Sequence, residues 1–245
     1  MKVRLDSLLV ERGYAETRSK ALALVMAGSV IVNGKVLTKA GSSIDHDSMI
    51  SLKEPQPYVS RAGMKLEAAL DAFHVDVEGK VAIDIGASTG GFTDVMIKRG
   101  ISRVYAIDVG HGQLHWSLRN HDRVINLEGV NARMLDASLI PEPCDIATFD
   151  VSFISLKLVI SPVMKVLRPS ADIIALIKPQ FEAGRHQVKR GGIVKDPGVV
   201  KEVLSGIQEF FTSSRLAVSG LIPSPIKGAR GNQEYLIHAT FGGEA

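Results

Sequence analysis

Four apolar runs in this sequence have charged residues at or near their carboxyl ends, with stretches of helical spacing between the runs. The runs cover residues 81–93, 104–109, 144–150 and 172–178. Alternation of strand and helix patterns predicts a sheet of parallel strands. The charged residues in question are Asp84, Asp108, Asp150 and Lys178. Open parallel sheets bind ligands outside the carboxyl ends of their strands, so we expect chemistry at this edge.

A fifth charged residue, Glu234, begins the last apolar run, 234–241. If this final strand is antiparallel to the others, its first residue lies at the edge where the parallel strands end. The sequence therefore predicts that five charged side chains lie together at one edge of the sheet.

The loop at 84–93 joins the first of these strands to a helix and is rich in glycine, which lets a backbone approach a ligand closely. A dinucleotide fingerprint needs glycine at position 88, where Ser88 stands, so hydride transfer is disfavoured. Asp84 suits a cationic group, and Asp108 lies at about the 20-residue distance typical of a ribose contact. Both fit S-adenosylmethionine, although the two aspartates can also simply end strands or cap helices.

Composition sets only broad bounds. The 245 residues are 45% apolar and carry a formal net charge of +3, which permits an anionic partner without requiring one. Cys144 is the single cysteine, and the first residues lack the apolar core of a signal peptide. No run reaches the roughly 18 apolar residues of a membrane span. We expect a cytoplasmic protein without stable membrane association, and nothing in the sequence indicates its oligomeric state.

The chain divides near 54–60, where two prolines favour extended backbone. We expect a small domain over 1–54, a linker over 55–60 and a larger domain over 61–245. The small domain reads as two short helices and a hairpin with a tight turn at Asn33-Gly34, followed by a last strand. These elements are expected at 5–12, 17–28, 30–37 and 49–52.

This small domain resembles the RNA-binding module first described in ribosomal protein S-four. The resemblance rests on Arg4-Leu5-Asp6, Leu9, Gly13, Thr17-Arg18, Ala21, Gly28, Val30, Val32-Asn33-Gly34 and Asp47. It implies that Arg4, Arg18 and Lys20 contact the phosphates of structured RNA. From the charge pattern alone, an ordinary solvated helix face explains Arg18 and Lys20 equally well.

The larger domain begins with a helical pattern at 60–73, for which Ser60 is the expected cap. Lys65 lies at the border of the apolar stripe of this helix. From its position alone, the simpler expectation is that its ammonium extends into solvent.

Residues 60–241 resemble the Rossmann-like methyltransferases of the FtsJ type, and the whole chain resembles the TlyA family, whose members are often labelled hemolysins. The FtsJ-type set of Lys, Asp, Lys and Glu is filled here, in order, by Lys65, Asp150, Lys178 and Glu234. The resemblance implies an α/β fold with a mostly parallel seven-stranded sheet and an antiparallel last strand. With the argument above, the expected contacts to S-adenosylmethionine come from Asp84, Gly86, Ser88, Gly90, Phe92, Thr93 and Asp108, and less directly from Asn131 or Asp136. No metal is expected.

Methylation of a ribose 2′-hydroxyl explains why lysines and carboxylates are needed, because the hydroxyl must be aligned with the methyl donor and must lose its proton. We expect Lys178 to be central, either accepting the proton or orienting the hydroxyl and stabilising its developing charge. Asp150 would hold Lys178 and face the sulfonium, while Lys65 and Glu234 organise the ribose.

The residues after Asp150 lack the prolines typical of enzymes that methylate base amines. Phe153 is positioned to stack a base, but a core phenylalanine is the simpler interpretation. The glycine-punctuated stretch 182–198 carries basic residues directly after Lys178, and further basic residues follow in 224–234. The basic residues of these two stretches are Arg185, Lys189, Arg190, Lys195, Lys227 and Arg230.

The resulting hypothesis is an S-adenosylmethionine-dependent RNA 2′-O-methyltransferase that acts on ribosomal RNA or a ribosomal subunit, with cytidine as the target implied by the resemblance. Two alternatives stay open. One is a membrane-active hemolysin, disfavoured by the absence of a signal peptide and of a membrane segment. The other is a non-catalytic RNA-binding assembly factor, which would bind no cofactor.

Overall fold

The computed structural model describes residues 1–53, 57–189, 191–228 and 230–242. Contacts divide the chain into two compact units, Met1–Pro57 and Tyr58–Ala245, and each has an apolar core of its own. Of the linker expected at 55–60, residues 55 and 56 lie outside the described residues.

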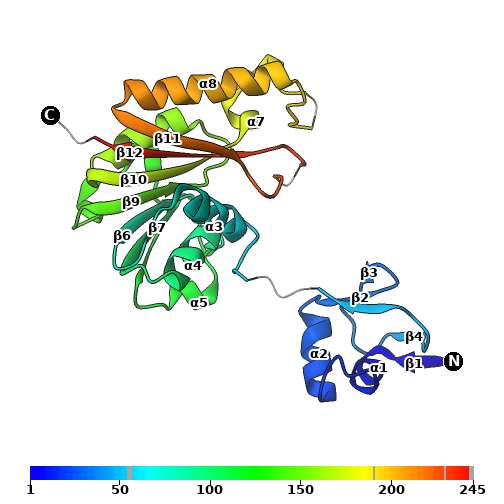
Figure 1. The fold of residues 1–245 in the computed structure, drawn as a ribbon. Coiled ribbons are helices and arrows are strands. Elements are labelled where there is room, and N and C mark those ends of the chain that lie inside the picture. The colour runs from blue at the N-terminus through cyan, green and yellow to red at the C-terminus, as the bar shows by residue number, and fades with distance from the viewer. Residues whose placement is uncertain (54–56, 190, 229, 243–245) are drawn as a thin grey trace. The chain divides into compact units, whose positions relative to one another are not determined.

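The smaller unit packs two helices against short strands (Figure 1). Its elements are β1 (Lys2–Arg4), α1 (Leu5–Glu11), α2 (Arg18–Met26), β2 (Val30–Val32), β3 (Lys35–Val36), β4 (Ser43–Asp45) and β5 (Ile50–Leu52). Helix α2 begins after Thr17, whose side chain accepts a hydrogen bond from the backbone N–H of Lys20. Asn33 and Gly34 both have positive φ, as the predicted tight hairpin turn between β2 and β3 requires. The pair formed by β1 and β4 was not expected, because strands of three residues leave little periodicity.

The larger unit is built on a seven-stranded sheet of order β11-β12-β10-β9-β6-β7-β8. Its strands are β6 (Val81–Ile85), β7 (Arg103–Asp108), β8 (Val124–Glu128), β9 (Cys144–Phe149), β10 (Leu167–Ile177), β11 (Leu216–Pro223) and β12 (Tyr235–Phe241). Strand β12 pairs antiparallel with β10 and β11, and the other pairs are parallel. The predicted mostly parallel sheet with an antiparallel last strand is confirmed.

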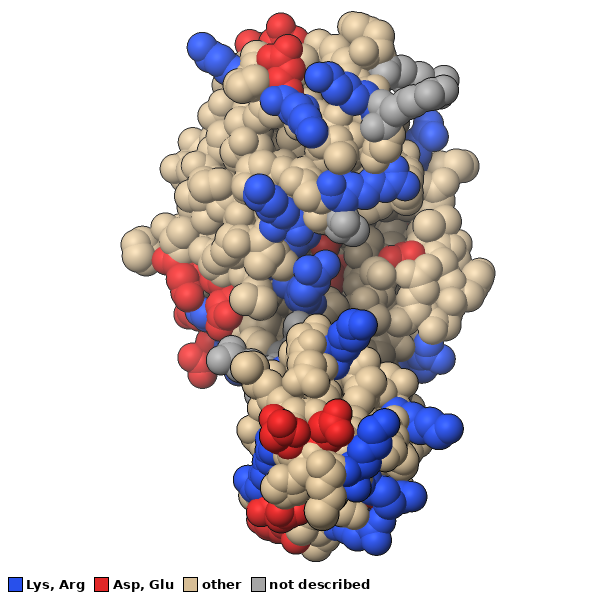
Figure 2. Space-filling model, turned by 90° about the vertical axis from the view of Figure 1, so that its right-hand side faces the viewer, with Lys and Arg blue, Asp and Glu red and all other residues tan. Residues whose placement is uncertain are grey.

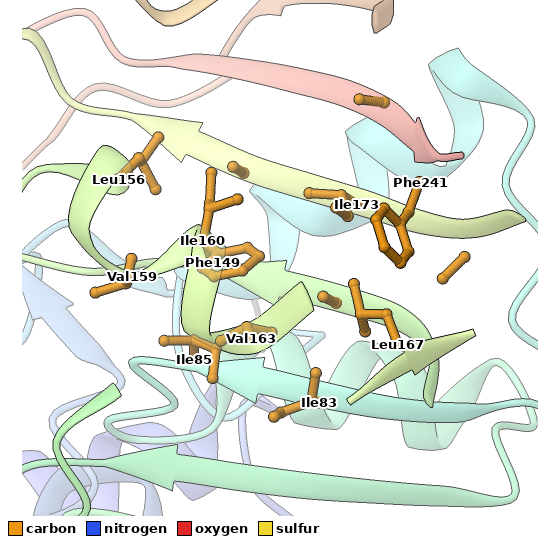
Figure 3. Close-up of a cluster of buried hydrophobic side chains, with 14 of the residues drawn as sticks. Ile83, Ile85, Phe149, Leu156, Val159, Ile160, Val163, Leu167, Ile173 and Phe241 are labelled. Atoms are coloured by element: carbon orange, nitrogen blue, oxygen red, sulfur yellow. The ribbon is translucent and has the colours of Figure 1, made fainter. Parts of the chain in front are cut away.

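Helices cover both faces of this sheet (Figure 1). They are α3 (Ala62–Phe73), α4 (Gly91–Lys98), α5 (Trp116–Arg119), α6 (Ile160–Met164), α7 (Pro179–Glu182) and α8 (Pro197–Ser213). Successive residues of a strand point to opposite faces, so Ile83 and Ile85 pack in the layer of α6 and α8, whereas Ala82 packs in the layer of α3 and α4. Figure 3 shows side chains of β6, β9, β10 and β12 meeting those of α6 in the first of these layers.

Helix α3 carries the predicted apolar stripe, and Leu66, Ala69 and Leu70 are buried. The predicted cap was wrong, because the helix starts after Arg61 and no side chain caps it. Ser60 instead lies against Gly91, where a Cβ atom would meet its hydroxyl at 2.3 Å. Among helices of the described residues, none is both long and apolar enough to cross a membrane.

Candidate active site

The four residues of the Lys-Asp-Lys-Glu set line one cavity of about 420 Å³, which we call the acceptor cavity. Lys65 comes from α3, Asp150 directly follows β9, Lys178 directly follows β10 and Glu234 directly precedes β12. Because β12 is antiparallel to β10, the residue before it lies at the edge where the parallel strands end. The sheet topology thus brings together side chains that are up to 169 positions apart in the chain.

Two ion pairs organise the acceptor cavity, and the first joins Lys65 to Glu234. The Lys65 Nζ atom lies 2.6 Å from Oε2 of Glu234, and the two residues are only 8% and 3% exposed. The expectation that Lys65 extends into solvent was therefore wrong. Its ammonium is held inside because α3 packs against β12, which places a carboxylate within reach.

The second ion pair joins Lys178 to Asp150. The Lys178 Nζ atom lies 2.6 Å from Asp150 Oδ1 and donates a hydrogen bond of 2.9 Å to the hydroxyl of Ser152. The Oδ1 atom of Asp150 is buried, with the ammonium of Lys178 as its ion-pair partner. Gln180 also lines the acceptor cavity, and its buried Oε1 atom has no hydrogen-bond donor among the described residues.

The glycine loop approaches the second ion pair through its backbone. Gly86 has a φ of 81°, and a Cβ atom at this position would lie 2.8 Å from the carbonyl oxygen of Asp150. Only glycine fits both the conformation and the close approach. Beside it lies a hollow of about 80 Å³, lined by the loop, by Phe92 and by Asp150.

A third cavity, of about 490 Å³, opens beside the carboxyl ends of β6, β7 and β8, and we call it the donor cavity. Asp108 lines it, and its carboxylate accepts hydrogen bonds from the backbone N–H groups of Ser88 and Gly110. Asn131 also lines this cavity, as do Gln113 and Arg133, which sequence reasoning did not select. Gln113 lies on a loop without periodicity, and Arg133 lies in the short 3-10 turn Ala132–Met134, which has no periodicity either.

Asp150 lines the acceptor cavity, the small hollow and the donor cavity. The three spaces therefore meet at a single residue. A ligand in the donor cavity and a ligand in the acceptor cavity can approach each other across Asp150, which is the arrangement that a group transfer needs.

Some predicted cofactor residues lie behind the loop instead of lining the donor cavity. Asp84 and Thr93 are fully buried, and Asp84 accepts hydrogen bonds from the hydroxyls of Thr93 (2.7 Å) and Thr148 (2.8 Å). Gly90 has positive φ and packs on leucine side chains, and Asp136 is exposed and caps a short turn. We propose that Asp84 and Thr93 hold the loop in place, tying it to β9.

Burial raises the pKa of Asp84 to about 6, against the opposing effect of the two threonine hydroxyls. Between pH 4 and 6 the unfolded chain loses this proton while the folded chain keeps it, so this carboxyl reduces stability as pH rises through that window. We expect the free energy of unfolding of Asp84→Asn to rise relative to that of the wild type by up to about 3 kcal/mol between pH 4 and pH 7. Denaturant unfolding at several pH values measures this, with exposed Asp122→Asn as the control; parallel stability curves for wild type and Asp84→Asn would contradict it.

Exposed basic side chains border the acceptor cavity at Arg61, Lys227 and Arg230. Figure 2 shows Lys and Arg gathered on this face of the larger unit, around a hollow in which acidic side chains are visible. Arg230 and buried Asn232 hold the loop after β10, because both donate to backbone carbonyls in 191–192 and Asn232 accepts from Val194.

The predicted RNA-binding residues of this loop are only partly described by the structure. Lys189 is exposed, and its backbone bridges to Ile193; Lys195 is also exposed. Arg190 and the side chain of Arg185 lie outside what the structure describes. Their contact with RNA stays a prediction.

Phe153 is not a core residue, so the simpler interpretation of the sequence was wrong. Its side chain is 86% exposed at the rim shared by the acceptor and donor cavities. Its backbone has a φ of 64°, a conformation that is unusual for a bulky residue. The ring contacts Phe181, with 4.9 Å between ring centroids, and its high exposure leaves it accessible to a planar ligand.

In the smaller unit, Arg4 and Arg18 both donate hydrogen bonds to Asp6. Lys20, predicted beside them, pairs with Glu16 instead. The two arginines thus share a carboxylate, whereas the charge of the lysine is matched by an exposed partner.

Comparison with known proteins agrees with this architecture. Residues 58–241 match the FtsJ-like methyltransferase family, and residues 3–50 match the S4 domain. This chain belongs to the TlyA family. It is 39% identical, over 96% of its length and 89% of the relative, to the 16S/23S rRNA (cytidine-2′-O)-methyltransferase TlyA of Mycobacterium tuberculosis. A candidate rRNA methyltransferase of Bacillus subtilis, YqxC, is 48% identical over 99% of this chain and 87% of its own.

A solved structure described as a candidate hemolysin, from Streptococcus thermophilus, superposes with a TM-score of 0.76 at 44% identity, covering 98% of this chain and 88% of that chain. Both resemblances expected from the sequence, to the S-four module and to the FtsJ-type methyltransferases of the TlyA family, are thereby confirmed.

Proposed function

We propose that this chain is an S-adenosylmethionine-dependent methyltransferase that modifies a ribose 2′-hydroxyl of ribosomal RNA, with cytidine as the target nucleoside. One observation carries the proposal: Asp150 joins a donor cavity, next to a glycine loop, to an acceptor cavity that contains both ion pairs. The name of the Mycobacterium tuberculosis relative supports the nucleoside and the RNA class. A ribosomal substrate also fits the cytoplasmic location expected from the sequence.

The residues of the donor cavity fit S-adenosylmethionine. Gly86 gives close backbone access, Asp108 offers carboxylate oxygens to a ribose, and Asn131 offers an amide to a base edge. When bound, the cofactor supplies an electrophilic methyl group on a sulfonium. The carboxylate of Asp150, between the cavities, favours a cation at this place.

The acceptor cavity prepares the hydroxyl. The ammonium of Lys178 holds the ribose oxygen and stabilises the negative charge that develops on it. The hydroxyl proton is directed to the carboxylate of Asp150, which forms the ion pair with Lys178. Lys65 and Glu234, fixed by their ion pair, bind the neighbouring ribose oxygens so that the 2′-oxygen lies on the axis of transfer.

The two domains have different proposed roles. We propose that residues 1–54 bind ribosomal RNA and that residues 61–245 carry out the transfer. The match of residues 3–50 to the S4 domain supports the first assignment, and the match of 58–241 to the FtsJ-like family supports the second.

Two measurements test the proposal together. Calorimetry should show binding of S-adenosylmethionine to the purified chain, and mapping of 2′-O-methyl groups should show a cytidine in 16S or 23S rRNA that is modified only when the chain is present. Cofactor binding without any new methyl group in ribosomal RNA would disprove the substrate. Absence of cofactor binding would support the non-catalytic assembly factor instead.

Phe153 provides a further prediction, because an exposed ring at the shared rim can stack on the target base. We expect Phe153→Ala to lower kcat/KM for ribosomal RNA by about 10-fold to 100-fold, the usual value of one stacked base. Phe153→Tyr keeps the ring and should retain most of the activity. Thermal unfolding should be the same for all three proteins, since the side chain is exposed. Full activity of Phe153→Ala would rule out the stacking role.

A further inference from the structure

A buried carboxylate of the smaller unit lies beneath two exposed arginine side chains. Asp6, in the first turn of α1, is 7% exposed, whereas the side chains of Arg4 and Arg18 are 56% and 61% exposed. The carboxylate is thus inside the unit while the two guanidinium groups that contact it reach the surface. Acidic and basic side chains lie close together on this unit in Figure 2.

Asp6 holds Arg4 in a fixed orientation. The Nε and Nη2 atoms of Arg4 donate to the two oxygens of Asp6 at 3.0 Å and 2.8 Å, a two-pronged contact that fixes the plane of the guanidinium. The other side of this guanidinium is limited by Gly41, where a Cβ atom would lie 3.3 Å from both Nη atoms. Arg4 is therefore oriented before any ligand arrives.

The same carboxylate sets the position of Arg18 relative to Arg4. Arg18, the first residue of α2, donates from Nη2 to Oδ2 of Asp6 at 3.1 Å, so one oxygen accepts from both arginines. These hydrogen bonds hold the pKa of Asp6 well below its usual range, with Arg4 as the main cause, so the carboxylate is ionised at neutral pH. Each guanidinium keeps further N–H donors for a second anion.

Lys20 offers a contrast in the same helix. Its partner Glu16 is 80% exposed, and both side chains lie at the surface four residues apart. Such a pair is flexible and contributes little, so it orders nothing around it.

We propose that Asp6 is a positioning residue for RNA: it holds Arg4 and Arg18 as a fixed pair of guanidinium groups that bind phosphates of the RNA backbone. The proposal rests on the proposed function, since it assumes that the smaller unit binds ribosomal RNA. It adds that a negatively charged residue strengthens the binding of a polyanion. The two arginine side chains are already ordered in the free protein, so RNA binding costs less conformational entropy.

Asp6→Asn separates this proposal from a model based on charge alone. The substitution raises the net charge by one unit, so charge alone predicts tighter binding of RNA. Positioning predicts the reverse, and we expect the full-length variant to bind transcribed 23S rRNA about tenfold more weakly, the effect of losing one good ionic contact. The slope of log binding constant against log salt concentration (the salt slope) should also be smaller in magnitude by about one. Glu16→Gln changes the charge equally at an exposed pair and should bind as tightly as the wild type or more tightly.

Arg4→Lys is the second variant, in case Asp6→Asn does not fold, which thermal unfolding will show. It keeps the charge but cannot make the two-pronged contact with Asp6, and we expect it to weaken RNA binding in the same way. Both variants should raise KM for RNA and leave kcat unchanged. Binding by either folded variant that equals that of Glu16→Gln, with an unchanged salt slope, would overturn the proposal. Affinity is measured without cofactor, so a wild type that binds RNA but transfers no methyl group would disprove the proposed function alone.

Discussion

Replacement of Lys178 by alanine should reduce methyl transfer to ribosomal RNA by at least about 1000-fold. The side chain lies 2.6 Å from Asp150, where the three cavities meet, and we propose it as the donor that stabilises charge on the ribose oxygen. Removal of one such donor from a buried site costs about 100-fold to 1000-fold in other enzymes, and here the position of Asp150 is lost as well. The cofactor contacts proposed above do not include Lys178, so affinity for S-adenosylmethionine should change little.

Single-turnover methyl transfer and calorimetry measure the two quantities separately. Lys201→Ala, which removes an exposed lysine of α8, is the matched control and should behave as the wild type. Near-normal turnover by Lys178→Ala would remove this lysine from the mechanism. A loss of activity that is explained by lost cofactor binding would assign Lys178 to the donor side.

The second large effect is expected from Glu234→Gln, which should reduce both stability and activity. Lys65 is buried against this carboxylate, and the substitution leaves its ammonium without a compensating charge. Breaking a buried ion pair in this way costs about 3–5 kcal/mol of folding free energy. Methyl transfer should fall by at least about 100-fold, because the ribose contacts lose their fixed geometry.

A double variant separates the two effects. Lys65→Met together with Glu234→Gln removes both charges, and replacement of a buried ion pair by neutral groups is often close to neutral for stability. We expect denaturant unfolding to recover most of the lost free energy while methyl transfer stays low. If the double variant regains activity along with stability, the pair serves the fold and has no role in the reaction.

Much of the larger unit could be predicted because its strands are buried on both faces and therefore appear as apolar runs. The edge that carries Asp150 and Lys178 follows from those runs alone, and Glu234 joins it once β12 is antiparallel. The strands β8 and β11 were not located from the sequence. They lie at the two edges of the sheet, where partly exposed residues interrupt the apolar pattern.

The individual partners of the site residues could not be predicted from the sequence. Lys65 appears on the border of a helix stripe, and only the packing of α3 on β12 shows that it is buried. Phe153 illustrates the opposite error, since an apolar residue after a strand is usually buried, yet its position at the rim leaves it exposed. Ser152 was passed over because a serine after a strand has many uses, and its contact with Lys178 depends on two loops meeting in space.

Because Asp150 lines all three cavities, we expect the affinities for the two proposed ligands to depend on each other. The backbone of Gly86 is in close contact with Asp150, so an occupant of one cavity changes the surroundings felt by an occupant of the other. Thermodynamic reciprocity then applies: the factor by which the methyl donor alters the affinity for the nucleotide equals the factor by which the nucleotide alters the affinity for the donor. A ribosomal particle that is already modified would thereby influence how tightly the enzyme retains its spent cofactor.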